Sequence, residues 1–217
     1  MCFKTSAERR SIKLEKQKLR EQIWREMEER GIARFPLPCR GRIPNFRGAE
    51  AAASKLLSIP EFKSAKIVLV APDSPQKPVR KLVLREGKTL VMPTPRLKSG
   101  FLVIKPGTAK INEAITIRGA FKHGVLTGKL PRVDFVVQGC VAVDREGRRL
   151  GKGGGYGDRE IEMARKENPN VKVAVTCHSI QVVSRVPFEK GDQRVDYICT
   201  EKEIIVVEAS EELEKQL

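Results

Sequence analysis

The chain has 217 residues, of which 40% are hydrophobic, so it can bury a core and is not a disordered tail. Its 42 Lys and Arg residues outnumber 27 Asp and Glu residues, and the net charge of +15 favours anionic partners or a highly soluble surface. No apolar run reaches the roughly 18 residues of a membrane span, and the charged N-terminus lacks a signal-peptide core, so we predict a cytoplasmic protein with no membrane partner.

The order of predicted elements alternates strands with helices. Helical spacing of apolar residues predicts a first helix over 11–30, which ends at Gly31. Prolines indicate an extended connection over 33–48, and an alanine-rich segment predicts a helix over 48–57. Six β-branched runs predict strands at 66–72, 88–93, 101–104, 134–143, 171–177 and 204–209. Helix-compatible stretches lie between several of them, at 78–86, 109–120 and 158–167.

The predicted strands lack strict alternation of polar and apolar residues. Such runs are typical of strands buried on both faces of a parallel sheet. With helices between the strands, they predict an open, mostly parallel α/β sheet in a single domain that spans 1–217. Ligands of such sheets usually bind beyond the carboxyl ends of the strands.

The cysteines do not suggest a disulfide framework or a zinc site. Their number is odd and no Cys-x-x-Cys pair occurs among Cys2, Cys39, Cys140, Cys177 and Cys199. Three of them sit in apolar runs, where a thiol usually behaves as a small buried hydrophobe.

The segment "RRLGKGGGYGDRE", residues 148–160, contains five glycines between a predicted strand and a predicted helix. It matches neither the Walker A loop nor the dinucleotide-binding fingerprint. Bare backbone N–H groups before a helix still form an anion site, to which Lys152 adds positive charge. The carboxylate of Asp158 would repel a phosphate unless Mg²⁺ bridges the two. The alternative is a flexible surface loop with Asp158 as the helix N-cap.

The same segment resembles the signature R-L-G-x-G-G-G-Y-Y-D-R of the 5-formyltetrahydrofolate cyclo-ligase family. The resemblance continues in "KQKLR" (16–20), which is similar to the family's K-x-x-L-R, and in "QVVSRVPFEKGD" (181–192) followed by "VDYICTE" (195–201). The segments "REQIW", "RIPNFRGAEAAA" and "MPTPRL" are similar to the branch of methenyltetrahydrofolate synthetase domain-containing proteins. The resemblance therefore covers most of the chain.

This resemblance implies a Rossmann-like α/β fold with helices on both faces of the sheet and the N-terminal helix packed on it. It also implies the ATP- and Mg²⁺-dependent conversion of 5-formyltetrahydrofolate to 5,10-methenyltetrahydrofolate. In phosphoryl transfer the protein mainly positions groups and stabilises charge, so Lys, Arg, Mg²⁺ and backbone N–H groups suffice.

The family motifs assign roles to individual residues. Arg149 and Lys152 would be catalytic, Tyr156 would bind the reduced folate, and Asp158 and Asp192 would bind the metal. The ATP ligands would be Lys16, Arg20, Gly151, Lys152, Gly153, Gly154, Gly155 and Gly157. Plainer alternatives are a solvated helix face for Lys16 and Arg20, a loop anchor for Tyr156, and a turn residue for Asp192.

The sequence departs from the family on the substrate side. Gly157 replaces the second tyrosine, Gly191 replaces a histidine, and segment 75–80 lacks the acid of the family's E-V-D-T. The alternative function is therefore a nucleotide-binding protein without folate turnover. RNA association would fit the charge of +15, although no aromatic RNA-binding motif is visible.

Overall fold

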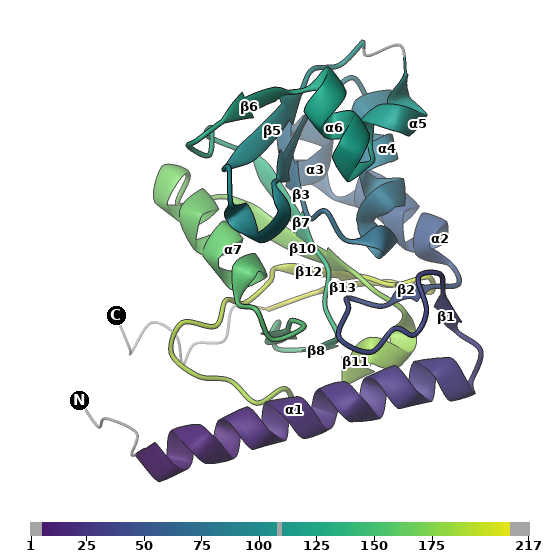
Figure 1. Ribbon diagram of the computed structural model, residues 1–217, viewed down its shortest axis with the longest axis vertical. Helices are drawn as coiled ribbons and strands as arrows, with labels where there is room; N and C mark the ends of the chain where they lie inside the picture. The colour runs from purple at the N-terminus through teal and green to yellow at the C-terminus, as the bar shows by residue number, and fades with distance from the viewer. Residues whose placement is uncertain (1–5, 108–109, 209–217) are drawn as a thin grey trace.

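The computed structural model describes residues 6–107 and 110–208 (Figure 1). Its helices are α1 (Ser6–Glu29), α2 (Ala49–Ser54), α3 (Pro60–Ser64), α4 (Lys77–Arg85), α5 (Ile111–Ala114), α6 (Ile117–His123) and α7 (Tyr156–Glu167). The 3-10 turns are η1 (Lys55–Ser58), η2 (Ser74–Gln76), η3 (Pro95–Leu97) and η4 (Ser179–Gln181). The strands are β1 (Ala33–Arg34), β2 (Asn45–Phe46), β3 (Ile67–Val70), β4 (Thr89–Pro93), β5 (Phe101–Ile104), β6 (Val125–Thr127), β7 (Phe135–Gln138), β8 (Ala142–Asp144), β9 (Arg149–Leu150), β10 (Lys172–Thr176), β11 (Val182–Val183), β12 (Tyr197–Cys199) and β13 (Ile204–Val206).

The central sheet has eight strands in the order β13-β12-β10-β7-β3-β4-β5-β6. The five strands from β12 to β4 run parallel to one another. At the edges, β13 pairs antiparallel with β12, β5 pairs antiparallel with β4, and β6 pairs antiparallel with β5. Both faces are covered, as two-sided burial of the strands requires. The predicted α/β class with a mostly parallel sheet is confirmed.

Residues of β3 alternate between the two halves of the core. Val68 and Val70 pack with α3 and α4, whereas Leu69 faces α7. In Figure 1, α7 lies on one side of the sheet and α2 to α4 lie on the other. This arrangement exposes the carboxyl ends of the parallel strands between the two helical layers.

Helix α1 packs beside the smaller sheet, whose order is β11-β8-β9. Ile23, Trp24 and Met27, which recur at helical spacing, are buried against Ala142 and Leu150. The Trp24 indole donates a hydrogen bond to the Arg42 carbonyl at 3.0 Å. The helix begins at Ser6, earlier than the sequence pattern predicts, and ends within one residue of the predicted position.

The predicted strand over 134–143 is wrong as a single element. The chain leaves the central sheet at Gln138 and enters the smaller sheet at Ala142. The break falls at Gly139, where a Cβ atom would lie 2.6 Å from both Gln76 Oε1 and Ile43 Cγ2. Close packing around one glycine therefore divides an otherwise continuous apolar run.

The predicted helix over 109–120 is also divided. Residue 109 lies outside the described residues, and the remainder forms α5 and α6. Thr116 Oγ1 accepts a hydrogen bond from the Gly119 N–H at 3.0 Å and so caps a new helix. In the same way, the predicted helix over 48–57 becomes α2 followed by η1, and the connection over 33–48 contains the two-stranded β1–β2 ribbon.

The four cysteines that the structure describes are buried and free, and Cys2 lies outside the described residues. Burial was predicted for the three in apolar runs, Cys140, Cys177 and Cys199, but not for Cys39. Within the described ranges, no helix is long and apolar enough to span a membrane.

Candidate functional site

A cavity of about 370 Å³ lies where the strand order of the central sheet reverses. β3 connects onward to β4 on one side, while β7 connects to β10 on the other. Pro72 and Asp73 follow β3, and Gln138 and Gly139 end β7, so both strand ends line the cavity. This is the position at which open α/β sheets usually bind ligands.

The glycine-rich segment forms the opposite wall of this cavity. Gly151, Lys152 and the residues from Gly154 to Asp158 line it. Gly155 holds the N-cap position of α7 with a left-handed backbone, φ 68°, and Gly153 has φ 111°. Asp158 lies inside the first turn of α7, so the alternative that it is the N-cap is wrong. The free N–H groups at the start of α7 border the cavity.

Arg149 extends from β9 to the wall of the cavity and is buried. Its Nη1 donates to the Gly139 carbonyl at 3.3 Å, and its Nη2 lies 2.7 Å from Asp158 Oδ1 as an ion pair. Among the described residues, however, Nε and Nη2 have no hydrogen-bond partner in suitable geometry. Because a buried guanidinium normally satisfies its donors, this arrangement leaves capacity for an anionic ligand.

Lys152 reaches across the cavity to the other strand end. Its Nζ lies 2.6 Å from Asp73 Oδ1, and its side chain is partly exposed. An exposed pair of this kind contributes little to stability and exchanges partners easily. Lys152 is therefore free to turn from Asp73 to a ligand.

Arg20 of α1 reaches the glycine loop, whereas Lys16, one turn earlier in the helix, forms ion pairs with Glu189 and Asp192. Arg20 Nε donates to the Gly151 carbonyl at 2.7 Å. Lys16 and Arg20 are only 8% and 9% exposed, so the solvated-face alternative is wrong. Burial lowers the pKa of Arg20, and the nearby Asp192 carboxylate partly offsets this effect.

The two predicted metal ligands lie on one side of the loop. Asp158 Oδ1 accepts a hydrogen bond from the Gln193 N–H at 3.0 Å, which brings the chain neighbour of Asp192 against Asp158. Asp192 Oδ2 binds Lys16 Nζ at 2.6 Å and also accepts from the Glu189 N–H, as a turn residue would. In the described part of the chain no three acidic, His or Cys side chains gather as a metal site. A metal here would need oxygen atoms from a ligand as well.

Glu160 is a site residue that the sequence analysis missed. It lines the cavity although it is only 4% exposed, and its Oε2 accepts from Gln138 Nε2 at 2.7 Å. Burial raises the pKa of Glu160 to about 7, against the opposing effects of the Gln138 hydrogen bond and of nearby Arg149 and Lys152. A buried carboxyl with a raised pKa that lines a cavity makes Glu160 a candidate functional residue.

A family model described as the 5-formyltetrahydrofolate cyclo-ligase family matches residues 6–201 of the chain. The chain belongs to this family. It is 38% identical over 211 residues to the human methenyltetrahydrofolate synthase domain-containing protein, covering 91% of this chain and 55% of that protein. The mouse protein of that name is 39% identical over 203 residues, covering 88% of this chain and 54% of that protein. The chain thus spans about half the length of these curated relatives.

Two solved cyclo-ligase-family structures share the fold. The 5,10-methenyltetrahydrofolate synthetase of Aquifex aeolicus aligns with a TM-score of 0.56 and 24% identity, over 90% of this chain and 94% of that one. The enzyme of that name from Mycoplasma pneumoniae aligns with a TM-score of 0.52 and 14% identity, over 89% of this chain and 99% of that one. Both confirm the α/β architecture.

The departures from the cyclo-ligase signature have local physical reasons. A Cβ atom on Gly157 would lie 3.0 Å from Arg149 Nη2, so glycine lets the guanidinium approach the start of α7. Gly191 has φ 100°, a conformation that side chains other than glycine rarely adopt. Tyr156 lines the cavity, with its ring against Gly154 and the Arg159 guanidinium 5.1 Å from its centroid.

In segment 75–80, where the cyclo-ligase family has an acid, this chain buries Gln76. Its Nε2 donates to Thr176 Oγ1 at 3.0 Å and to the Thr176 carbonyl at 3.2 Å. Glu160 reaches the same end of β7 from the opposite helical layer, through Gln138. The buried acid of this cavity is therefore Glu160 of α7, whereas the segment after β3 contributes Asp73, which is paired with Lys152.

Proposed function

We propose that this protein is an ATP- and Mg²⁺-dependent 5-formyltetrahydrofolate cyclo-ligase. The observation that carries the proposal is the buried Arg149, whose Nε and Nη2 lack hydrogen-bond partners within the described residues, beside a glycine loop at the point of strand-order reversal. Phosphate oxygens match those donors in charge and geometry. The relatives, named for methenyltetrahydrofolate synthesis, supply the substrate class.

In this proposal the ATP phosphates lie between the start of α7 and Arg149. Lys152 leaves Asp73 and binds a phosphate oxygen, while Arg20 holds the loop through Gly151. ATP would transfer its γ-phosphoryl group to the formyl oxygen with release of ADP. The other folate nitrogen would then attack the activated carbon and lose its proton, and phosphate would leave. These residues mainly position the reactants and neutralise charge that develops during transfer.

Asp158 and Asp192 are the proposed Mg²⁺ ligands. Two carboxylates together with phosphate oxygens and water are a usual coordination set for this ion. Tyr156 and Glu160 face the folate in this arrangement. The Tyr156 ring offers a flat surface to the pterin, and Glu160 accepts hydrogen bonds from its N–H groups, in place of the acid absent from segment 75–80.

The cytoplasm stays the predicted location of the protein.

Mixing the purified protein with 5-formyltetrahydrofolate, ATP and Mg²⁺ tests the proposal directly. We expect methenyl absorbance to rise together with phosphate release, and to require all three components. Chelation of Mg²⁺ should stop both signals. ATP binding without methenyl formation would instead support a nucleotide-binding protein without folate turnover.

Changing Lys16 and Arg20 to alanine together is expected to weaken ATP binding at least tenfold. Each charged hydrogen bond made to the phosphates contributes roughly 1.5–3 kcal/mol. Titration calorimetry with ATP and Mg²⁺ measures the effect.

The matched control changes Lys13 and Lys18, which are exposed on the same helix, to alanine. This variant removes the same charge and should bind ATP as the wild type does. Unchanged ATP affinity in the Lys16 and Arg20 variant would assign those side chains to packing of the loop alone.

A further inference from the structure

A second cavity, of about 840 Å³, lies between the β1–β2 ribbon, α2 and α4. Its lining is strongly basic, with one acid, Glu50, among the described residues that form it. The basic side chains are Arg34, Arg47, Lys77, Lys81 and Arg85. We call this cavity the basic groove. It is separate from the glycine-loop cavity, although the loop after β3 contributes to both.

Helix α4 places three cations along one wall of the basic groove. Lys77, Lys81 and Arg85 recur every four residues, so they share one face of the helix. The helical rise separates successive charges by about 6 Å. Within the described ranges these three side chains form no ion pair and no hydrogen bond. A row of regularly spaced, unneutralised cations suits a ligand with regularly spaced anions.

The β1–β2 ribbon forms the opposite wall of the basic groove. Arg34 and Arg47 each donate to the Gly31 carbonyl, at 3.2 and 3.0 Å, which fixes their side chains. Phe35 is 82% exposed, and Asn45 Nδ2 holds its backbone carbonyl at 2.8 Å. An exposed aromatic ring on a fixed segment, in the same lining as the row of cations, can stack with a planar base.

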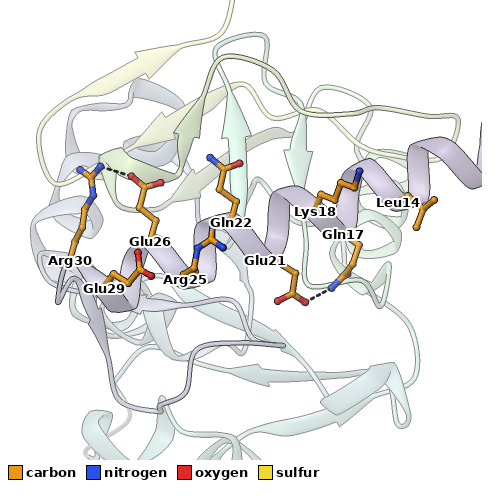
Figure 2. A pocket seen from close by; sticks show the side chains of 9 residues that line it. All are labelled: Leu14, Gln17, Lys18, Glu21, Gln22, Arg25, Glu26, Glu29 and Arg30. Atoms are coloured by element: carbon orange, nitrogen blue, oxygen red, sulfur yellow. Dashed lines mark hydrogen bonds and ion pairs between the residues drawn. The ribbon is translucent and has the colours of Figure 1, made fainter.

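The outer face of α1 has no such excess of positive charge. On the outer face of α1, shown in Figure 2, Lys18, Arg25 and Arg30 alternate with Glu21, Glu26 and Glu29. Arg30 pairs with Glu26 at 2.6 Å, and Gln17 donates to Glu21 at 2.7 Å. That face is balanced in charge, whereas the basic groove is not.

We infer that the basic groove binds a single strand of nucleic acid. The phosphates lie along Lys77, Lys81 and Arg85, and a base stacks on Phe35. Charge complementarity selects a polyanion, and the exposed ring favours a polymer that carries bases over one that carries only carboxylates. Because cations dominate the lining, binding is expected to depend on charge more than on sequence.

The test measures binding of a fluorescent oligouridylate of about 12 nucleotides by anisotropy, between about 50 and 200 mM salt. Changing Lys77, Lys81 and Arg85 to glutamate should weaken binding roughly 100-fold at about 0.1 M salt and reduce the slope of log K against log salt by about 2. Phe35→Ala should weaken binding without changing that slope. If the glutamate variant fails to fold, the corresponding triple alanine variant takes its place.

The control changes Lys13, Lys18 and Arg25 of α1 to glutamate, which alters the net charge equally on another face. It should retain nearly full affinity. An equal loss in both triple variants would overturn the inference, because net charge alone would then explain binding. Absence of binding by the wild type at low salt would also overturn it, as would equally effective displacement by polyglutamate, which would assign the groove to carboxylate polymers.

Discussion

Replacing Arg149 by methionine is expected to lower ATP-dependent turnover roughly 10²- to 10³-fold, the usual cost of removing a donor that stabilises developing charge. Methionine keeps most of the side-chain volume but has no N–H groups to offer a phosphate. Arg149 Nε has no hydrogen-bond partner within the described residues, and Nη2 forms an ion pair with Asp158 without a hydrogen bond of suitable geometry, so the loss should appear in turnover and in nucleotide affinity. Single-turnover assays and titration with ATP measure the two separately.

Arg148→Met is the matched control for this variant. Arg148 precedes Arg149, but it binds Asp144 at 2.7 Å and does not line the cavity. This change should lower the melting temperature while turnover per folded molecule stays near the wild-type value. Turnover of the Arg149 variant within a few-fold of the wild type would contradict its proposed role.

Replacing Glu160 by glutamine is expected to stabilise the protein at pH 8 by on the order of 1–3 kcal/mol and to change its stability little at pH 4. Burial raises the folded-state pKa of Glu160 to about 7, whereas an unfolded Glu titrates near 4.3. The folded state therefore holds this proton more tightly, and stability falls as the pH rises from about 4 to 7. Glutamine removes that dependence because it carries no charge.

The same variant should bind 5-formyltetrahydrofolate more weakly, because an amide accepts hydrogen bonds less strongly than a carboxylate. Glu162→Gln is the control, since Glu162 lies on the exposed side of α7 and pairs with Lys166. Denaturant unfolding at the two pH values, together with folate titration, measures both effects. A Glu160 variant that gains no stability at pH 8 would show that the wild-type carboxyl is already well accommodated as an ion.

The sequence predicted correctly those helices and strands that can be recognised from the spacing of their own apolar residues. The apolar periodicity of α1 and the β-branched runs of β3, β4 and β10 predicted these elements correctly. Burial of one or both faces of an element determines the spacing of its apolar residues along the chain, so the sequence shows it. The run 134–143 misled because its break depends on Gln76 and Ile43, which approach Gly139 only in the folded chain. Gly139 itself is the signal within the run that could have indicated the break, since a glycine inside a strand pattern often marks a bulge or a close approach of another segment.

The residues of the candidate site were likewise predicted only in part from the sequence. The family motifs pointed to Arg149, Lys152 and Asp158, which the structure brings together around one cavity. Glu160 was missed because a glutamate in a charged helix usually faces solvent. Its spacing to the buried Ala164 would have shown that it lies on the apolar side of α7. Asp73 also lines the cavity, and its position directly after a predicted strand could have identified it as a site residue.

Three basic side chains at or beside the glycine loop already have acidic partners. Lys152 binds Asp73, Arg149 binds Asp158, and Lys16 binds Asp192 and Glu189. A nucleotide arriving alone meets these carboxylates as well as the cations, and a metal ion arriving alone meets the cations. If ATP and Mg²⁺ bind as proposed, the cations would turn to phosphate and the released carboxylates would turn to the metal. We therefore expect cooperative loading, in which each of the two ligands raises the affinity for the other by the same factor.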